Sequence, residues 1–254
     1  MTIRDLYRAL DNMYPKSLSC DWDNDGFMLC ADPDKEVRRI MLALDASDEA
    51  ISYAADNGCQ VLLTHHPLLF RPLRSVTPDS LSGKRALTAV RSDVAIMSFH
   101  TRLDAGQGGV NDALVEALGF TSGGTFGDDG APTLGRIVYL EDEMPLEDFA
   151  ALVKTKLGCP MIQYAGKRPV KTVALVGGGG GDFIYPALAA GADTLITGDS
   201  GYNITLDAAD DGINVIQAGH YYTEAPVLAR LADICRQLCG AECLFFDSNP
   251  IKVL

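Results

Sequence analysis

The chain contains an internal duplication of a β-α-β unit, and this feature limits its possible folds more than any other. Residues 37–64 have the apolar pattern of a strand, a helix closed by Gly58 and a second strand. At an offset of 133 residues the same pattern returns without a gap in residues 170–197, where Gly191 takes the place of Gly58. Self-similarity of this kind indicates a copied supersecondary unit, and β-α-β units predict parallel sheets.

A further apolar strand follows each copy, and each of these strands ends in a histidine. One leads to His100, with Asp104 four residues later, and the other leads to His220, with Glu224 four residues later. These two segments match at an offset of 120 residues rather than 133. The first copy therefore carries about 13 extra residues, which we place in the loop 70–83.

The duplication predicts an α/β protein made of two similarly wound halves. We expect the first half to span residues 1–125 and the second to span 135–254, with 126–134 as the connection between them. The segment 122–132 is rich in glycine and aspartate, a composition typical of a surface connection. The C-terminal segment can pack back on the first half. We expect a functional site at the cleft where the strand ends of the two halves face each other.

A strand of the first half runs straight into two adjacent histidines. Residues 61–64 read as a buried parallel strand, and His65, His66 and Pro67 follow. Pro67 cannot donate to a ladder, so the strand must end before it. Neighbouring residues of a strand point to opposite faces, so the two imidazoles could each serve a different ion. The alternative is one buried core histidine beside a solvated one.

All four histidines are thus expected at the carboxyl ends of parallel strands, where open α/β sheets bind their ligands. Imidazoles and carboxylates without cysteine suit a catalytic site for Zn, Mn, Fe, Co or Ni. The candidate ligands outnumber those that one ion needs, which favours two divalent ions. A bridging carboxylate would hold the two ions together, and we choose Asp104 for this role. The alternative is that some histidines are only core or surface residues, and it applies best to His100.

The motifs around these residues resemble the NGG-interacting-factor-like family, whose members are commonly named type 2 GTP cyclohydrolase I. The similarity covers nearly the whole chain, in order, at residues 22–26, 64–70, 100–104, 108–112 and 218–224. It implies a dinuclear site and a ring-like homohexamer, and this chain has the short form without an inserted domain. The metal ligands that it implies are His65, His66, Asp104, His220 and Glu224.

The resemblance implies a metal-dependent hydrolase that acts on a nucleotide-like small molecule. In this interpretation His100 is a catalytic group outside the ligand set that passes a proton. The alternative is a protein without enzymatic activity that binds or delivers metal or serves as a regulatory scaffold. One departure concerns substrate contacts, because Gly201, Tyr202 and Asn203 stand where family members commonly carry Lys-Tyr-His.

The glycine run 177–181 follows a strand and precedes a helix. Its amides could hold a phosphate, although the run lacks the GK[ST] of a P-loop. A close approach of backbone to backbone, or to the metal cleft, explains the glycines equally well.

Composition excludes some classes of function. The net charge of −13 argues against a nucleic acid as the main partner. The sequence contains no apolar run long enough to span a membrane. None of the 7 cysteines forms a CxxC pair, so a cytoplasmic location fits best.

Overall fold

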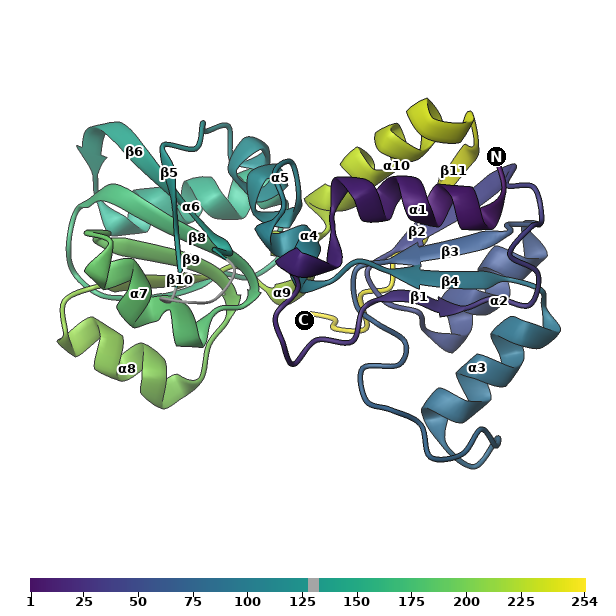
Figure 1. Ribbon diagram of the computed structural model, residues 1–254. Coiled ribbons are helices and arrows are strands. Elements are labelled where there is room, and N and C mark those ends of the chain that lie inside the picture. Colours follow the sequence, from purple (N-terminus) through teal and green to yellow (C-terminus); the bar gives the residue numbers. More distant parts are fainter. Residues whose placement is uncertain (128–132) are drawn as a thin grey trace. The chain divides into compact units, whose positions relative to one another are not determined.

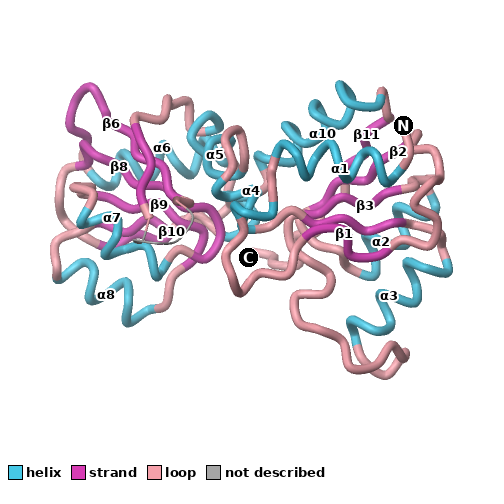
Figure 2. Tube along the Cα trace, viewed as in Figure 1, coloured by secondary structure: helices cyan, strands magenta, loops and turns pink. Residues whose placement is uncertain are grey.

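A computed structural model describes residues 1–127 and 133–254, which divide into two compact units. The first unit comprises Met1–Leu103 and Leu228–Pro250, and the second comprises Asp104–Val227 and Ile251–Leu254. Each unit has one β-sheet with helices against it, as the colour-coded trace in Figure 2 makes clear. Of the expected connection 126–134, residues 128–132 lie outside the described part of the chain.

The first unit contains a five-stranded sheet in which four strands are parallel. The strand at one edge runs antiparallel to its neighbour, and the strand at the other edge comes from the C-terminal part of the chain. In spatial order the strands are β1 (Gly26–Leu29), β4 (Ala95–Ser98), β3 (Val61–Thr64), β2 (Arg39–Ala43) and β11 (Glu242–Phe245). The expected strands around residues 37–44, 59–64 and 94–100 are therefore confirmed.

Helices cover both faces of this first sheet. Figure 1 shows α1 and α10 on one side of it and α2 and α3 on the other. The first of these begins with a capping box in which Thr2 and Asp5 bond each other's backbone amides. Ser47 caps the second helix through the amide of Ala50. The helices are α1 (Ile3–Met13), α2 (Asp48–Asp56), α3 (Leu81–Arg91) and α10 (Pro226–Cys239), with a 3-10 turn η1 (Lys16–Leu18).

The second unit contains a six-stranded sheet with a parallel centre. Three central strands are parallel, and the flanking strands are antiparallel to them. In spatial order the strands are β5 (Gly124–Phe126), β6 (Gly135–Met144), β8 (Val170–Gly179), β9 (Thr194–Asp199), β10 (Asn214–Gln217) and β7 (Gln163–Ala165).

Alternating residues of β8 divide the core of the second unit into two layers. Val173 and Leu175 pack with Phe149 of α6, whereas Ala174 and Val176 pack with residues of α7 and α8. This is the period-2 pattern of a strand that is covered on both faces. The helices are α5 (Val110–Ala117), α6 (Leu146–Leu157), α7 (Ile184–Ala189), α8 (Tyr202–Asp210) and α9 (His220–Glu224), with a 3-10 turn η2 (Gly181–Phe183). The short helix α4 (Thr101–Ala105) contains the boundary between the units.

The predicted duplication is confirmed by the topology of the two sheets. The order β4-β3-β2 in the first sheet matches β10-β9-β8 in the second, with the same parallel pairing. An antiparallel edge strand lies next to β4 in one sheet and next to β10 in the other. The copies differ at the opposite edge, where β11 extends the first sheet while β6 and β5 extend the second.

Candidate metal centre

His65, His66 and His100 lie together at the carboxyl end of the first sheet. The parallel neighbours β3 and β4 end at Thr64 and Ser98, so the residues that follow both strands emerge at the same edge. One potential ligand nitrogen from each imidazole lies within 4.8 Å of the other two. The rings of His65 and His66, 4.9 Å apart, converge because both residues follow the last strand residue, where strict alternation ends.

Each of these three imidazoles has its Nδ1 on an acceptor. His65 Nδ1 donates to the carbonyl oxygen of Phe99 at 2.8 Å, and His66 Nδ1 donates to Asp45 Oδ1 at 2.9 Å. His100 Nδ1 donates to Asp23 Oδ1, also at 2.9 Å. A neutral imidazole with its proton on Nδ1 keeps its lone pair on Nε2. This is the arrangement of metal-binding histidines, whose second nitrogen is commonly held by a carboxylate or a carbonyl.

Two buried carboxylates, those of Asp23 and Asp25, hold His100 in place. Asp23 also accepts hydrogen bonds from the amide and hydroxyl of Thr101. Burial alone would raise the pKa of Asp23, but the hydrogen bonds from His100 and Thr101 lower it to about 2. Asp25 accepts from the His100 amide and from the Nε of Arg102, whose side chain is fully buried. Both acids therefore stay ionised at neutral pH and fix the start of α4.

In the second unit, His220 lies between two carboxylates. Its Nδ1 is 2.7 Å from Asp199 Oδ2, and its Nε2 is 3.2 Å from Glu224 Oε1. The hydrogen bond to Glu224 raises the pKa of His220 to about 9 against the opposing effect of desolvation, with Asp199 adding to the rise. Without a metal ion the imidazole is thus protonated at neutral pH. The two residues come together because α9 places positions four apart on one face.

The glycine run brings β8 close to the His220–Glu224 pair. Gly178 has φ +68°, and a Cβ there would collide with Glu224 Oε1 and lie 3.2 Å from His220 Nε2. A Cβ on Gly177 would lie 3.2 Å from the carbonyl oxygen of Thr223. Gly177–Gly179 belong to the strand itself, and the helix expected after the run starts at Ile184, after a 3-10 turn. Close backbone approach therefore accounts for Gly177 and Gly178.

Asp104 belongs to the second unit and lies, half buried, near the end of α4. Its backbone carbonyl accepts from Asn111 Nδ2 at 3.3 Å, and Asn111 Oδ1 accepts from the amide of Gly177 at 2.7 Å. The fully buried Asn111 thus ties the segment that carries Asp104 to the strand beside Glu224. The contacts described here join His65, His66 and His100 in one unit, and His220 and Glu224 in the other.

The donor atoms suit a divalent metal ion. The chain provides imidazole nitrogens and carboxylate oxygens in groups that could bind such an ion, and the described groups contain no thiolate. The sequence predicted the four histidines and Glu224, but not the other three carboxylates that hold imidazoles, those of Asp23, Asp45 and Asp199. The only sequence signal for these was the similarity of residues 22–26 to a family motif, which covers Asp23. Asp45 follows the end of β2 by two residues and Asp199 is the last residue of β9, and neither belongs to a motif of its own.

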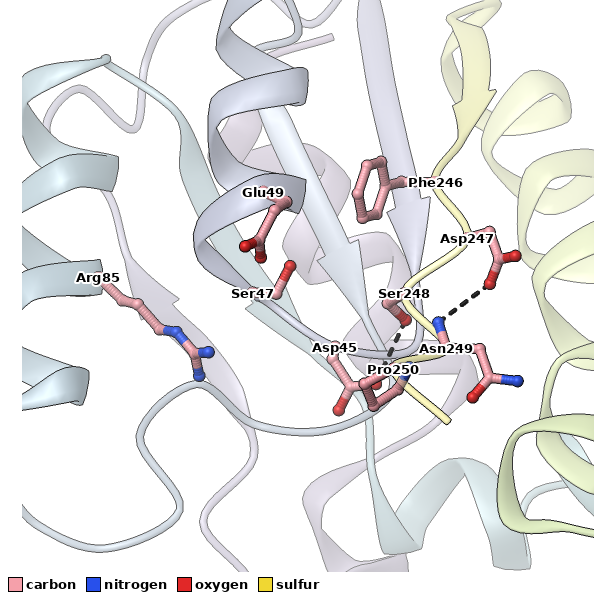
Figure 3. A pocket seen from close by; sticks show the side chains of 9 residues that line it. All are labelled: Asp45, Ser47, Glu49, Arg85, Phe246, Asp247, Ser248, Asn249 and Pro250. Atoms are coloured by element: carbon pink, nitrogen blue, oxygen red, sulfur yellow. Dashed lines mark hydrogen bonds between the residues drawn. The ribbon is translucent and has the colours of Figure 1, made fainter. Parts of the chain in front are cut away.

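A cavity of about 490 Å³ opens beside Asp45, at the carboxyl ends of β2 and β11 (Figure 3). Ser248 Oγ donates to Asp45 Oδ2 at 3.2 Å while Asp45 Oδ1 holds His66. The carboxylate that orients His66 therefore also lines this cavity. The residues that line the cavity are Asp45, Ser47, Glu49, Arg85, Phe246, Asp247, Ser248, Asn249 and Pro250.

Comparisons with known sequences give consistent results. Residues 1–250 match the family model for Duf34/NIF3 (NGG1p interacting factor 3). A Clostridium perfringens protein named "GTP cyclohydrolase 1 type 2 homolog" is 35% identical, and the match covers 99% of this chain and 98% of the relative. A Clostridium acetobutylicum protein with the same name is 34% identical over 100% of this chain and 95% of its own length. No helix in the described residues combines the length and apolarity needed to cross a membrane.

Solved structures agree with the sequence matches. A Staphylococcus aureus protein, SA1388, superimposes with a TM-score of 0.88 at 26% identity over 100% of this chain and 99% of its own. A Bacillus cereus protein described as related to NIF3 shares the fold at a TM-score of 0.86 and 24% identity, over 100% and 99% of the two chains. These matches confirm the resemblance seen in the motifs. The chain belongs to the Duf34/NIF3 (NGG1p interacting factor 3) family.

Proposed function

We propose that this protein is a metal-dependent hydrolase that acts on a nucleotide-like small molecule. The observation that supports it most is that every histidine in the chain has its Nδ1 held by a carbonyl or a carboxylate. Four such imidazoles at the carboxyl ends of parallel strands form an arrangement built to present Nε2 atoms. The names of the relatives, GTP cyclohydrolase 1 type 2 homologs, support a nucleotide as the substrate class.

The proposed ligands contribute only nitrogen and oxygen atoms, which suits two divalent ions of Zn, Mn, Fe, Co or Ni. Ions at such a site would polarise the substrate and lower the pKa of water towards neutrality. Asp104 would be the carboxylate shared by both ions, as predicted from the sequence. The proposed ligands are His65, His66, Asp104, His220 and Glu224.

Within this site the protein residues have distinct tasks. The Phe99 carbonyl and the Asp45 carboxylate fix the rings of His65 and His66, so the two Nε2 atoms need no reorganisation to act as ligands. His220 must lose the proton that it shares with Glu224 before its Nε2 can act as a ligand. Because of that proton, we expect metal binding by His220 and Glu224 to depend on pH.

His100 is suited to move a proton. Its Nδ1–H is held by the ionised Asp23, so its Nε2 can accept a proton from attacking water, and Asp23 stabilises the resulting imidazolium. The same Nε2–H can then protonate the leaving group. This role needs no covalent intermediate on the protein.

We further propose that the protein works as a homohexamer in the cytoplasm, as the family resemblance implies. Light scattering coupled to size-exclusion chromatography tests the hexamer, and a smaller species at working concentration contradicts it.

The test of the proposed function pairs metal analysis with turnover. The protein is purified without added metal, reconstituted with each candidate ion, and assayed for hydrolysis of GTP and of phosphodiesters. His65→Ala should lose both bound metal and activity. Ser98→Ala is the matched control, because Ser98 is also fully buried at a strand end, and its hydroxyl bonds Thr64 Oγ1. Ser98→Ala should keep both its bound metal and its activity.

Two results contradict the proposal. Activity that survives in His65→Ala excludes the proposed mechanism. A wild-type protein that binds metal and hydrolyses none of these substrates is instead a metal-binding, metal-delivery or regulatory protein.

A further inference from the structure

Two exposed aromatic rings, those of Trp22 and Phe70, lie next to His100. Trp22 is the only tryptophan of the chain, and 62% of its surface is exposed, while Phe70 is 44% exposed. The centroid of the Trp22 ring is 6.0 Å from that of His100, and the Phe70 centroid is 6.2 Å from it. Single exposed aromatic residues are common on protein surfaces, but here two of them meet a histidine of the proposed catalytic site.

The backbone holds both rings in place although their side chains face solvent. Trp22 lies in a turn closed by a 3.0 Å hydrogen bond from the Asp23 amide to the Cys20 carbonyl, and the Cys20 amide bonds Thr101 Oγ1. The next side chain, Asp23, is buried against His100. Asn24 Nδ2 donates to the carbonyl oxygen of Leu69, which links the turn to the segment that carries Phe70. A preorganised aromatic side chain loses little entropy when it binds a ligand.

The three rings meet at steep angles rather than covering one another. The interplanar angle is 66° between Trp22 and Phe70, 72° between Trp22 and His100, and 85° between Phe70 and His100. Edge contacts of this kind leave ring faces open for stacking. A flat ligand ring that stacks on Trp22 lies parallel to the indole ring. The plane of the ligand therefore makes the same steep angle as the indole does with the plane of His100, the imidazole that we assign to proton transfer.

We propose that Trp22 and Phe70 form a stacking subsite for a planar heteroaromatic ring of the substrate and hold that ring beside His100. This inference rests on the proposed function, because it assigns part of the substrate to the same site. The subsite selects for a flat π-system and not for a sugar or a phosphate. Stacking of a base on an aromatic side chain changes affinity by roughly tenfold to hundredfold.

Because Trp22 is the only tryptophan, its intrinsic fluorescence reports on the subsite directly. Guanosine 5′-monophosphate should quench this emission saturably, whereas ribose 5-phosphate, which lacks the ring, should not. Acrylamide should also quench the free protein strongly. Emission that acrylamide does not reach would mean that another copy of the chain covers Trp22, and this would overturn the proposal.

Equilibrium dialysis with guanosine 5′-monophosphate extends the test to variants that lack the fluorophore. Trp22→Leu and Phe70→Leu should each bind the nucleotide at least tenfold more weakly, while Trp22→Phe should retain most of the affinity because it keeps a flat ring. Tyr139→Leu is the matched control, because Tyr139 is 63% exposed and lies on β6 of the second unit. It should bind like the wild type, and circular dichroism checks that each variant is folded.

The results separate failure of the subsite from failure of the proposed function. Wild-type affinity in a folded Trp22→Leu variant, or equal binding of the nucleotide and ribose 5-phosphate, overturns the subsite. Hydrolysis by the wild type with an unchanged KM in Trp22→Leu also overturns the subsite but leaves the proposed function standing. Ring-dependent binding through Trp22 without any hydrolysis supports the subsite and contradicts the proposed function.

Discussion

His100 Nδ1 donates a hydrogen bond of 2.9 Å to Asp23 Oδ1, across 77 positions of the sequence. The carboxylate is buried, and it also bonds the amide and hydroxyl of Thr101, so one acid fixes both the ring of His100 and the start of the helix that follows. Asp23 therefore serves both stability and the proposed function, because the carboxylate that orients the His100 imidazole also holds the backbone amide of Thr101.

Replacement of Asp23 by asparagine should destabilise the protein in a pH-dependent manner. The folded-state pKa of Asp23, about 2, lies below its ordinary value of 3.8, so the carboxylate contributes roughly 2 kcal/mol to the free energy of unfolding above pH 4. This contribution disappears as the pH falls through about 2. The free energies of unfolding of Asp23→Asn and of the wild type, measured with urea, should therefore differ less as the pH is lowered from 7 to 3. Asp21→Asn, at an exposed neighbouring acid, should show no such trend.

Arg102 should be among the most sensitive positions of the first unit. Its fully buried guanidinium bonds Asp25 Oδ2 at 3.0 Å, Asp11 Oδ1 at 2.5 Å and the Tyr14 carbonyl at 2.9 Å. Arg102→Met leaves the buried carboxylate of Asp25 without this partner and should cost about 3–5 kcal/mol in the free energy of unfolding.

The control for Arg102 is Arg4→Met, which removes an exposed ion pair with Asp34 and should change the free energy of unfolding far less. Equal losses of unfolding free energy in the two variants, measured with urea, would show that the buried contacts of Arg102 stabilise the protein no more than an exposed ion pair does.

Gly178→Ala should disrupt the His220–Glu224 pair as well as the backbone. The residue has φ +68°, and its new Cβ would collide with the Glu224 carboxylate. Gly191→Ala is the matched control, since Gly191 has φ +83° and open space around its Cα, so it should lose only about 1 kcal/mol of stability. Metal content per folded chain should fall in the first variant and stay unchanged in the second. A Gly178→Ala protein that retains its metal would show that the close approach is unimportant for the site.

The metal-free protein should contain a histidine that titrates well above the ordinary imidazole pKa of 6.5. The hydrogen bond from His220 to Glu224 raises the pKa of His220 from its ordinary 6.5 to about 9. Because the folded-state value is the higher one, the pair stabilises the fold below pH 6.5, and this contribution is lost as the pH rises through about 9. Glu224→Gln should return the titration towards 6.5, as followed by NMR of the imidazole protons. An unshifted His220 in the wild type would contradict the observed pairing.

Local patterns were sufficient to predict the parallel strands of the two copied units, with ends that lie within a few residues of those in the structure. The apolar run before His65 and Pro67, and its counterpart before Gly198, determined β3 and β9 because buried strands carry continuous apolar runs. The strand ends in turn located the four histidines. By contrast, no part of the pattern indicated β5, β6 and β7, and β5 and β6 have no copy in the first half.

Contacts between distant residues could not be predicted in this way. The partner of His66 is one of 34 acidic residues, and nothing local to Asp45 distinguishes it from the others. The pairing of β11 with β2 joins Glu242 to Arg39, across most of the chain, and periodicity contains no information on such a pairing. The glycines at 177 and 178 were recognised as significant, but the carboxylate that they accommodate became evident only from the fold.

The proposed function depends most on two ions being bound jointly by side chains from both halves of the duplication. The most direct measurement is a crystal structure of the metal-loaded protein with anomalous difference maps recorded at the absorption edge of the bound metal. We predict two peaks per chain, with His65 and His66 bound together with Asp104, His220 and Glu224. A single peak, or an ion bound by ligands from one unit alone, would contradict the claim.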